Sequence, residues 1–293
     1  MFYEFAIDPT ILKSWDNCRY IKDHFGVPKG RMISRFPKAW FKIVHQGISD
    51  EVPPRERTKI INALNKIKEQ RSFSAFRNWD NDKDWNKNVI EQHELNPFYG
   101  IISNAINDEV NEVIFFDELD EDHPHFKIDT SVKIKRTEDD MANTVRPFLI
   151  FGKEFKFIDP YFNGVNNRHV KPLIKFLETI VSRENKVPID RVEYHFNDKI
   201  KDKKFLEQNI LTLENKIPNG IKIDFYSWPT SKMHDRFILT NLGGVSFGIG
   251  LDIHEGSGNE VDTITLLDDQ RYEKEWDDYS SSSEHLVCSI DKT

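Results

Sequence analysis

Cysteines, long apolar runs and metal-ligand clusters are all scarce in this sequence of 293 residues. The only two cysteines, Cys18 and Cys288, are far apart in the chain, which suggests neither a disulfide framework nor a cysteine-based zinc site. No apolar run approaches the roughly 20 residues that span a bilayer, and the first ten residues lack the pattern of a signal peptide. We therefore expect a cytoplasmic protein with no membrane partner, no metal and no other cofactor.

Positive charge is concentrated near the N-terminus, although the whole chain has a formal net charge of −8. Residues 1–71 hold 14 Lys and Arg against 8 Asp and Glu, and aromatic residues are interleaved with these cations. Such interleaving is typical of nucleic-acid or partner binding, and the cations expected to contact phosphates are Lys29, Arg31, Arg35 and Lys38. A solvated face is the alternative for the cations, and a place in the core is our interpretation of the aromatics.

The C-terminal half of the sequence alternates regularly between β and α patterns. Short apolar runs bounded by turn residues predict five central strands, at 154–159, 192–196, 221–226, 236–241 and 245–250. Helical apolar spacing separates the first three, which predicts an α/β fold with right-handed crossovers. We therefore expect an α/β protein in two parts. Residues 1–140 form a mostly helical region with a few strands, and residues 141–293 form a mixed sheet flanked by helices.

A predicted hairpin near the C-terminus carries the residues with the clearest chemistry. Two short apolar runs are separated by Gly243-Gly244, which is a turn signal. His234 and Arg236 stand two positions apart at the start of the first run, and alternation along a strand puts both on one face. An imidazole beside a fixed guanidinium suits phosphate chemistry, because Arg holds two phosphate oxygens at once.

The spacing behind His234 resembles the H-x-K signature of the phospholipase D superfamily. That signature reads His-x-Lys, four residues, Asp, six residues and then Gly-Ser-x-Asn. Here Arg236 stands in the Lys position and Asn241 in the Asp position. Gly248 keeps its place, and Leu251 occupies the place of the Asn. This H-D-R form is similar to divergent members of the superfamily, and it covers one copy of the motif in less than half of the chain.

The resemblance implies a metal-independent phosphodiesterase, specifically a nuclease that could be the effector of a bacterial defence system. In that mechanism His234 attacks phosphorus and forms a phosphohistidine, while Arg236 holds the non-bridging oxygens. With one motif per chain, two chains pair and each contributes a histidine, so the resemblance implies a homodimer or a subunit of a larger assembly. Asp252 or Asp262 would orient the imidazole. We expect one pocket to hold the histidine, the arginine and at least one nearby acid: Asp159, Asp252 or Asp262.

A binding module is the alternative to an enzyme. The Ser and Asn of the Gly-Ser-x-Asn turn contact phosphate in the family, and Leu251 cannot replace them. Asp252 would repel a phosphate unless it pairs with His234 or Arg236. The alternative is therefore a catalytically inactive phospholipase D-like module that binds nucleic acid, another phosphate or a partner protein.

Polar residues at the ends of the predicted strands complete the candidate site. Asp159 and Tyr161 follow the first central strand, where polar groups line the ligand crevice of open α/β sheets. We expect both, together with Asn241, to contact the substrate. His195, at the end of the next strand, is interpreted as a hydrogen-bonded core residue. A second H-x-K string, His125-Phe126-Lys127, has no Gly-rich turn behind it and is interpreted as loop.

Overall fold

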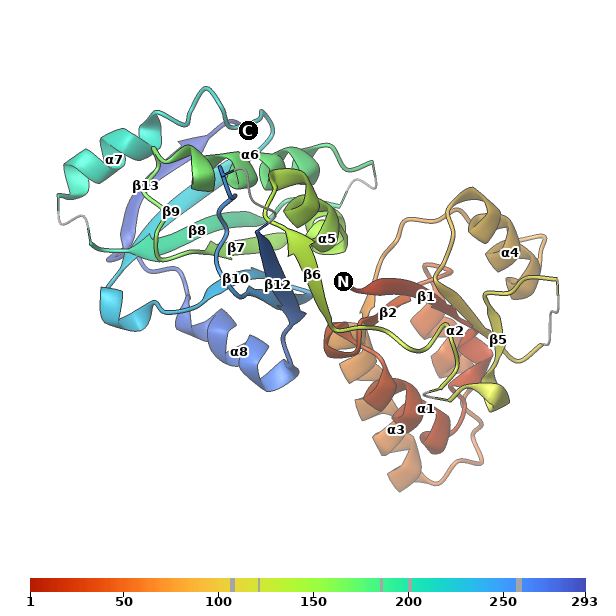
Figure 1. Ribbon diagram of the computed structural model, residues 1–293. Coiled ribbons are helices and arrows are strands. Elements are labelled where there is room, and N and C mark those ends of the chain that lie inside the picture. The colour runs from red at the N-terminus through yellow and green to blue at the C-terminus, as the bar shows by residue number, and fades with distance from the viewer. Residues whose placement is uncertain (106–108, 121, 185–186, 200–201, 257–259) are drawn as a thin grey trace. The chain divides into compact units, whose positions relative to one another are not determined.

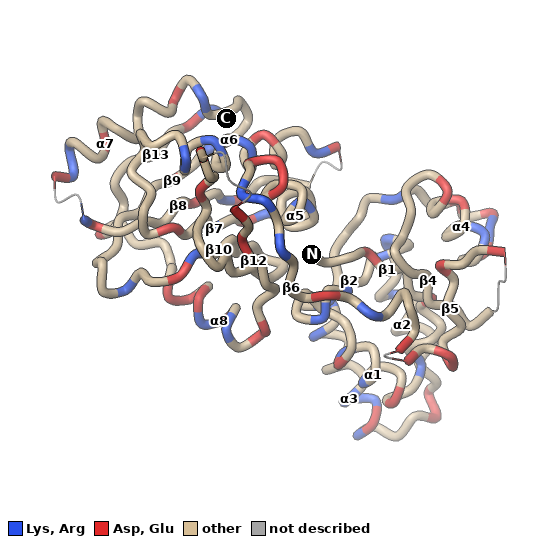
Figure 2. The backbone as a smooth tube through the Cα atoms, viewed as in Figure 1, with Lys and Arg blue, Asp and Glu red and all other residues tan. Residues whose placement is uncertain are grey.

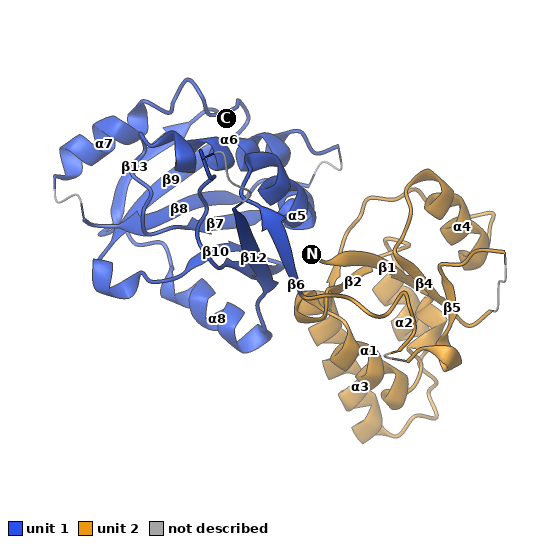
Figure 3. Ribbon diagram, viewed as in Figure 1, with its two compact units in different colours: residues 1, 131–293 blue, residues 2–130 orange. Residues whose placement is uncertain are grey.

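The computed structural model describes residues 1–293 except 106–108, 121, 185–186, 200–201 and 257–259. The chain forms two compact units, one of residues 2–130 and one of Met1 with residues 131–293 (Figure 3). We call these the N-terminal unit and the C-terminal unit. Each has its own sheet and its own hydrophobic core.

The N-terminal unit is built on a parallel sheet with the strand order β3-β2-β1-β4-β5 (Figure 1). Its strands are β1 (Tyr3–Ile7), β2 (Arg31–Ser34), β3 (Ser72–Phe73), β4 (Gly100–Ser103) and β5 (Val113–Phe115). Its α-helices are α1 (Trp15–His24), α2 (Trp40–Gly47), α3 (Pro54–Lys66) and α4 (Trp85–Leu95). Phe5 and Ile7 of β1 pack in a core with α1, α2 and α3, whereas Ala6, which alternates with them, packs with α4. Helices therefore cover both faces, as in a doubly wound sheet.

The C-terminal unit is built on a mixed sheet with the order β13-β9-β8-β7-β10-β11-β12-β6. Its strands are β6 (Ser131–Lys135), β7 (Glu154–Ile158), β8 (Arg191–Asn197), β9 (Lys222–Trp228), β10 (Arg236–Thr240), β11 (Gly243–Phe247), β12 (Val261–Leu266) and β13 (Leu286–Asp291). Its α-helices are α5 (Glu138–Phe151), α6 (Asn167–Val181), α7 (Lys203–Leu211) and α8 (Asp269–Asp278). Strands β7, β8 and β9 run parallel, and their other neighbours are antiparallel.

Short helical turns complete both units. They are the 3₁₀ turns Pro9–Ile11, Val27–Lys29, Phe116–Glu118 and Thr230–Lys232, and the π-helical turn Ile67–Arg71. Within the described residues, no helix combines the length and the apolar character that crossing a membrane requires.

The predicted α/β class and the five predicted central strands are confirmed. Each predicted range overlaps one of β7 to β11, and all five lie in the same sheet. The division of the chain falls after Thr130 rather than after residue 140. The reason is that β6 pairs antiparallel with β12, so this strand belongs to the C-terminal sheet. The N-terminal part contains helices as predicted, but they surround a parallel sheet.

The faces of the central strands decide which side chains reach the candidate site. Ile158 of β7 is paired with Phe237 of β10, and both pack in one core. Phe157, which alternates with Ile158, instead stacks on a phenylalanine of α6 on the other face of the sheet. Because side chains alternate between faces, Asp159 and Arg236 lie on the α6 face.

Candidate functional site

An exposed tyrosine near the carboxyl end of β7 is flanked by two cations. Tyr161 is 53% exposed. The guanidinium carbon of Arg236 lies 5.1 Å from the centroid of the tyrosine ring, and the ammonium nitrogen of Lys199 lies 4.9 Å from it. Both distances are within the roughly 6 Å over which cation–π attraction acts. The ring therefore holds two cations at the surface, one from β10 and one from the segment after β8.

Arg236 is half-buried and keeps unused hydrogen-bonding capacity. Its Nη1 donates to the main-chain oxygen of His234 at 3.1 Å. Its Nε is buried and makes no hydrogen bond to any of the described residues. Because a guanidinium carries five N–H donors in a planar fork, most of this fork remains available to an anion.

His234 is exposed and lies just before β10 begins. Its Nε2 lies 3.1 Å from the main-chain oxygen of Ser231. Since a carbonyl oxygen only accepts, the neutral ring carries its proton on Nε2. The neighbouring carboxylate, Asp235, pairs with Arg271 at 3.0 Å. No carboxylate of the described residues contacts the ring of His234, so none of them orients this imidazole.

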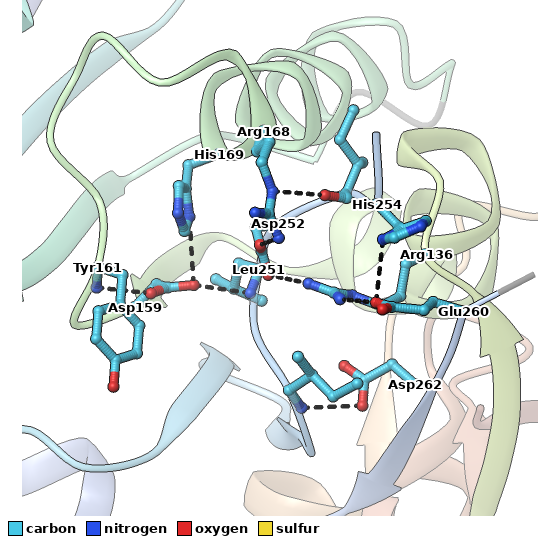
Figure 4. Close-up of polar contacts among 12 residues, drawn as sticks. Arg136, Asp159, Tyr161, Arg168, His169, Leu251, Asp252, His254, Glu260 and Asp262 are labelled. Atoms are coloured by element: carbon cyan, nitrogen blue, oxygen red, sulfur yellow. Dashed lines mark hydrogen bonds and ion pairs between the residues drawn. The ribbon is translucent and has the colours of Figure 1, made fainter. Parts of the chain in front are cut away.

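Asp159 is fully buried and is held from several directions. Its Oδ1 accepts the amide N–H of Tyr161 at 2.8 Å, and its Oδ2 accepts that of Leu251 at 2.8 Å. The Nδ1 of His169 lies 3.6 Å from the same Oδ2 (Figure 4). Extending the pairing of β7 with β10 by one residue puts Arg236 opposite Asp159. Three predicted site residues, Asp159, Tyr161 and Arg236, are thus brought together.

Asp252 is the centre of an ion-pair network beside Asp159 (Figure 4). Its Oδ1 pairs with the guanidinium of Arg136, and its Oδ2 pairs with Arg168 at 2.6 Å. Arg136 also pairs with Glu260 at 2.6 Å, and the Nδ1 of His254 lies 3.1 Å from the same glutamate. The network joins the end of β6, the first turn of α6 and the segment between β11 and β12.

The two acids predicted to orient His234 have other partners. Both oxygens of Asp252 are engaged by arginines. Asp262 accepts the amide N–H groups of Ile249 at 3.0 Å and Thr263 at 2.7 Å through Oδ1. Its Oδ2 is buried and has no hydrogen-bond partner within the described chain. The expectation that one of these acids fixes the imidazole is therefore not met.

Two further positions have structural contacts. The Oδ1 of Asn241 accepts the amide N–H of Lys153 at 2.7 Å, which ties the β10–β11 turn to the start of β7 instead of facing a ligand. His195 is fully buried between the carboxylate of Glu193, at 3.2 Å, and the indole N–H of Trp228, at 2.9 Å. The interpretation of His195 as a core residue is confirmed. The second H-x-K string, at 125–127, lies outside any helix or strand, as interpreted.

Two of the four N-terminal cations predicted to contact phosphate instead make structural contacts within the N-terminal unit. Arg31 is buried, donates to the main-chain oxygen of Phe126 and lies with its guanidinium carbon 3.7 Å from the centroid of that ring. Arg35 donates to main-chain oxygens beside β3, and burial lowers its pKa. Only Lys29 and Lys38 of the four are exposed. Lys and Arg are interspersed with Asp and Glu along both units (Figure 2).

Four residues around the site were not predicted: Arg136, Arg168, His169 and Lys199. Arg136 is 116 positions away from its partner Asp252, and nothing in the sequence connects the two. Arg168 and His169 had a usable signal. They open the helix that directly follows Asp159 and Tyr161, and the first turn of such a helix lies at the ligand-binding edge of an α/β sheet.

Burial and charge shift two groups close to Asp159. Tyr194 is fully buried, and its hydroxyl has no hydrogen-bond partner among the described residues. Burial, followed by the charges of Asp159 and Asp252, raises the pKa of Tyr194 well above its usual value. Burial lowers the pKa of the Arg136 guanidinium, but its hydrogen bonds and charge interactions with Asp252 and Glu260 have the larger combined effect. The pKa of Arg136 is therefore raised above its usual value. In the described part of the chain, no three His, Cys, Asp or Glu side chains gather as a metal site.

Comparison with known proteins gives little guidance to function. No family model matches the chain, and no curated protein matches it. Among solved structures, the chain has a likeness to TrmBL2, an archaeal chromatin protein whose structure shows a novel mode of DNA binding. The TM-score is 0.26 at 10% sequence identity, over 52% of this chain and 54% of that chain. This chain thus covers about half of the archaeal protein, and a likeness this weak supports no functional conclusion.

Proposed function

We propose that the C-terminal unit is a phospholipase D-like module that binds the phosphates of a nucleic acid. The observation that carries the proposal is the arrangement of Arg236 and Lys199 about the exposed ring of Tyr161. Cations beside an aromatic platform are the common means of binding single-stranded nucleic acid, because the cations neutralise phosphates while a base stacks on the ring.

The charge balance of the site favours an anionic ligand. Two acids of the site are already engaged: Asp159 accepts two amide N–H groups, and Asp252 lies between two arginines. Arg236 has a buried Nε with no partner in the described chain, and Lys199 is exposed. An incoming phosphate would therefore meet two cations whose N–H donors are not all used by the described residues.

The surroundings of His234 favour a binding function over a phosphohistidine mechanism. A nucleophilic imidazole works best when an acid fixes its orientation and tautomer, and His234 has only the main-chain oxygen of Ser231 for this purpose. Leu251 offers the site no polar side chain, and its amide N–H is already donated to Asp159.

Equilibrium binding to labelled oligonucleotides tests the proposal. Single- and double-stranded DNA and RNA of one sequence would be titrated with the wild type, Tyr161→Ala and Lys199→Ala at several salt concentrations. We expect single strands to bind more tightly than duplexes, and Tyr161→Ala to reduce this preference. Lys199→Ala should reduce the slope of log K against log salt by about the value of one phosphate contact. Lys204→Ala, an exposed lysine on α7, is the matched control. Equal binding by all four proteins would refute the proposed surface.

A phosphohistidine phosphodiesterase is the second candidate, and one observation favours it. The ring of His234 is exposed, its Nδ1 has no partner in the described chain, and it precedes Arg236 by two residues. A second copy of the chain, as a homodimer or within a larger defence assembly, would supply the other histidine. Trapping a phosphorylated histidine after acid-free denaturation, and its loss in His234→Ala, would support this candidate.

A further inference from the structure

Asp159, which accepts the amide N–H of Tyr161, forms a carboxylate–imidazole pair with His169. Asp159 is completely buried, and amide N–H groups on both of its oxygens hold it in one orientation. His169, in the first turn of α6, places its Nδ1 3.6 Å from Oδ2 of this carboxylate. Figure 4 shows the imidazole directed at Asp159.

Two polar groups around this pair have unused capacity. The hydroxyl of Tyr194 and the Nε of Arg236 are buried, and neither makes a hydrogen bond to the described residues. Buried polar groups are almost always paired in folded proteins, so unpaired ones mark a place where a ligand or an ordered water binds. Both residues lie around Asp159, because Arg236 is opposite Asp159 across the strands and the charge of Asp159 acts on Tyr194.

We propose that Asp159 and His169 are a proton-transfer pair and that the module hydrolyses the phosphodiester that it binds. This inference rests on the proposed function, because Arg236 and Lys199 must first hold the phosphate. Asp159 is the positioning residue: it takes the Nδ1–H of His169 and so leaves the lone pair on Nε2. His169 is the general base, and the exposed His234 is the general acid.

All groups that the hydrolysis requires, apart from water, come from one chain. A water molecule gives a proton to Nε2 of His169, and its oxygen forms a bond to phosphorus. The P–O bond to the leaving oxygen breaks, and that oxygen takes a proton from the imidazolium of His234. Arg236 stabilises the charge that builds on the non-bridging oxygens. The products are a phosphomonoester and an alcohol, and solvent returns the proton from His169 to His234.

This inference differs from the second candidate in the nature of its intermediates. No phosphate becomes attached to the protein, and a second copy of the chain is not required. The two imidazoles have separate roles: His169 accepts a proton and His234 donates one.

The experiment measures cleavage and binding in parallel on the full chain. The substrates are single- and double-stranded DNA and RNA of one sequence, assayed across pH with the wild type, His169→Gln, Asp159→Asn and His45→Gln. His45 is an exposed histidine of the N-terminal unit and is the matched control. We expect His169→Gln to lower kcat by roughly 100-fold or more, with Kd within about twofold of the wild type. Asp159→Asn should lower kcat and leave KM unchanged, because Asp159 positions the base and does not bind the substrate.

Added imidazole separates a catalytic loss from a folding loss. In His169→Ala the missing ring leaves a space, and we expect free imidazole to restore part of the cleavage in a saturable manner. Binding without cleavage of any substrate would overturn the inference and leave the proposed function intact. Cleavage that passes through a phosphorylated His234, or that His169→Gln does not change, would also overturn it. Absence of nucleic-acid binding would overturn both this inference and the proposed function.

Discussion

Asp252 and Arg136 form an ion pair that is almost completely buried, with 11% and 4% of their side chains exposed. Arg168 neutralises the other oxygen of the same carboxylate at 2.6 Å. The pair therefore connects the end of β6 to the segment between β11 and β12, directly beside Asp159. It fixes the wall of the candidate site and keeps a negative charge from repelling a bound phosphate.

Removal of one member of this pair should destabilise the C-terminal unit strongly. Asp252→Ala leaves the buried charge of Arg136 with only Glu260 opposite it, and we expect the free energy of unfolding to fall by roughly 3–5 kcal/mol. The exposed pair of Lys274 with Asp278 is the control, and Lys274→Ala should change the free energy of unfolding far less. Urea unfolding measures both changes. Similar small losses in the two variants would show that the buried pair is not a structural clamp.

Lys156 should make stability depend on pH. It is buried under α8, where its ammonium donates to the main-chain oxygens of Trp276 and Tyr279, and burial lowers its pKa to about 8. The folded protein therefore gives up this proton more readily than the unfolded chain, whose lysine pKa is about 10.5. Relative to Lys156→Met, the free energy of unfolding of the wild type should rise between pH 8 and pH 10, by roughly 3 kcal/mol at most.

The difference between the two proteins is the quantity to measure for Lys156. The buried Tyr279 and the partly buried Tyr272, whose pKa values are raised by desolvation, oppose the rise above about pH 10 in both proteins. Chemical denaturation at each pH gives the two curves. A constant or falling difference from pH 8 to pH 10 would contradict the assignment.

Arg31 should act on stability, in contrast to the exposed Lys29. Arg31→Met removes the hydrogen bonds that this side chain donates to the main-chain oxygens of His24 and Phe126. We expect a loss of roughly 2–4 kcal/mol in the N-terminal unit. Lys29→Met should change stability by less than about 0.5 kcal/mol. Thermal unfolding of both variants decides, and an unchanged transition for Arg31→Met would mean that its contacts are not needed.

The five central strands of the C-terminal unit, β7 to β11, could be predicted because their apolar runs are bounded by clear turn residues. The N-terminal sheet was harder, because its strands are only two to five residues long. Its second strand begins with a charged residue, Arg31, whose burial depends on an acceptor 95 positions away at Phe126. Short buried strands of a parallel sheet carry no alternating pattern, so only the tertiary pairing defines them.

The site was predictable where it depends on strand geometry. Alternation and the position at a strand end point to Arg236, Asp159 and Tyr161, and the structure places Arg236 beside the ring of Tyr161 and opposite Asp159. The partners of Asp252 and Asp262 could not be predicted from the sequence. A carboxylate can bind a main-chain amide or a distant arginine as readily as a histidine that lies close to it in the chain. The sequence contains no local sign of these partners.

The most direct measurement for the central claim is the salt dependence of single-strand binding by the wild type and Arg236→Ala. If Arg236 holds a phosphate beside Tyr161, its loss should weaken binding at about 0.1 M salt by roughly tenfold, or about 1.4 kcal/mol. The slope of log K against log salt should fall by about one contact. Arg236→Lys should retain the slope and lose part of the affinity. An affinity and a slope that Arg236→Ala leaves unchanged would contradict phosphate binding at this site.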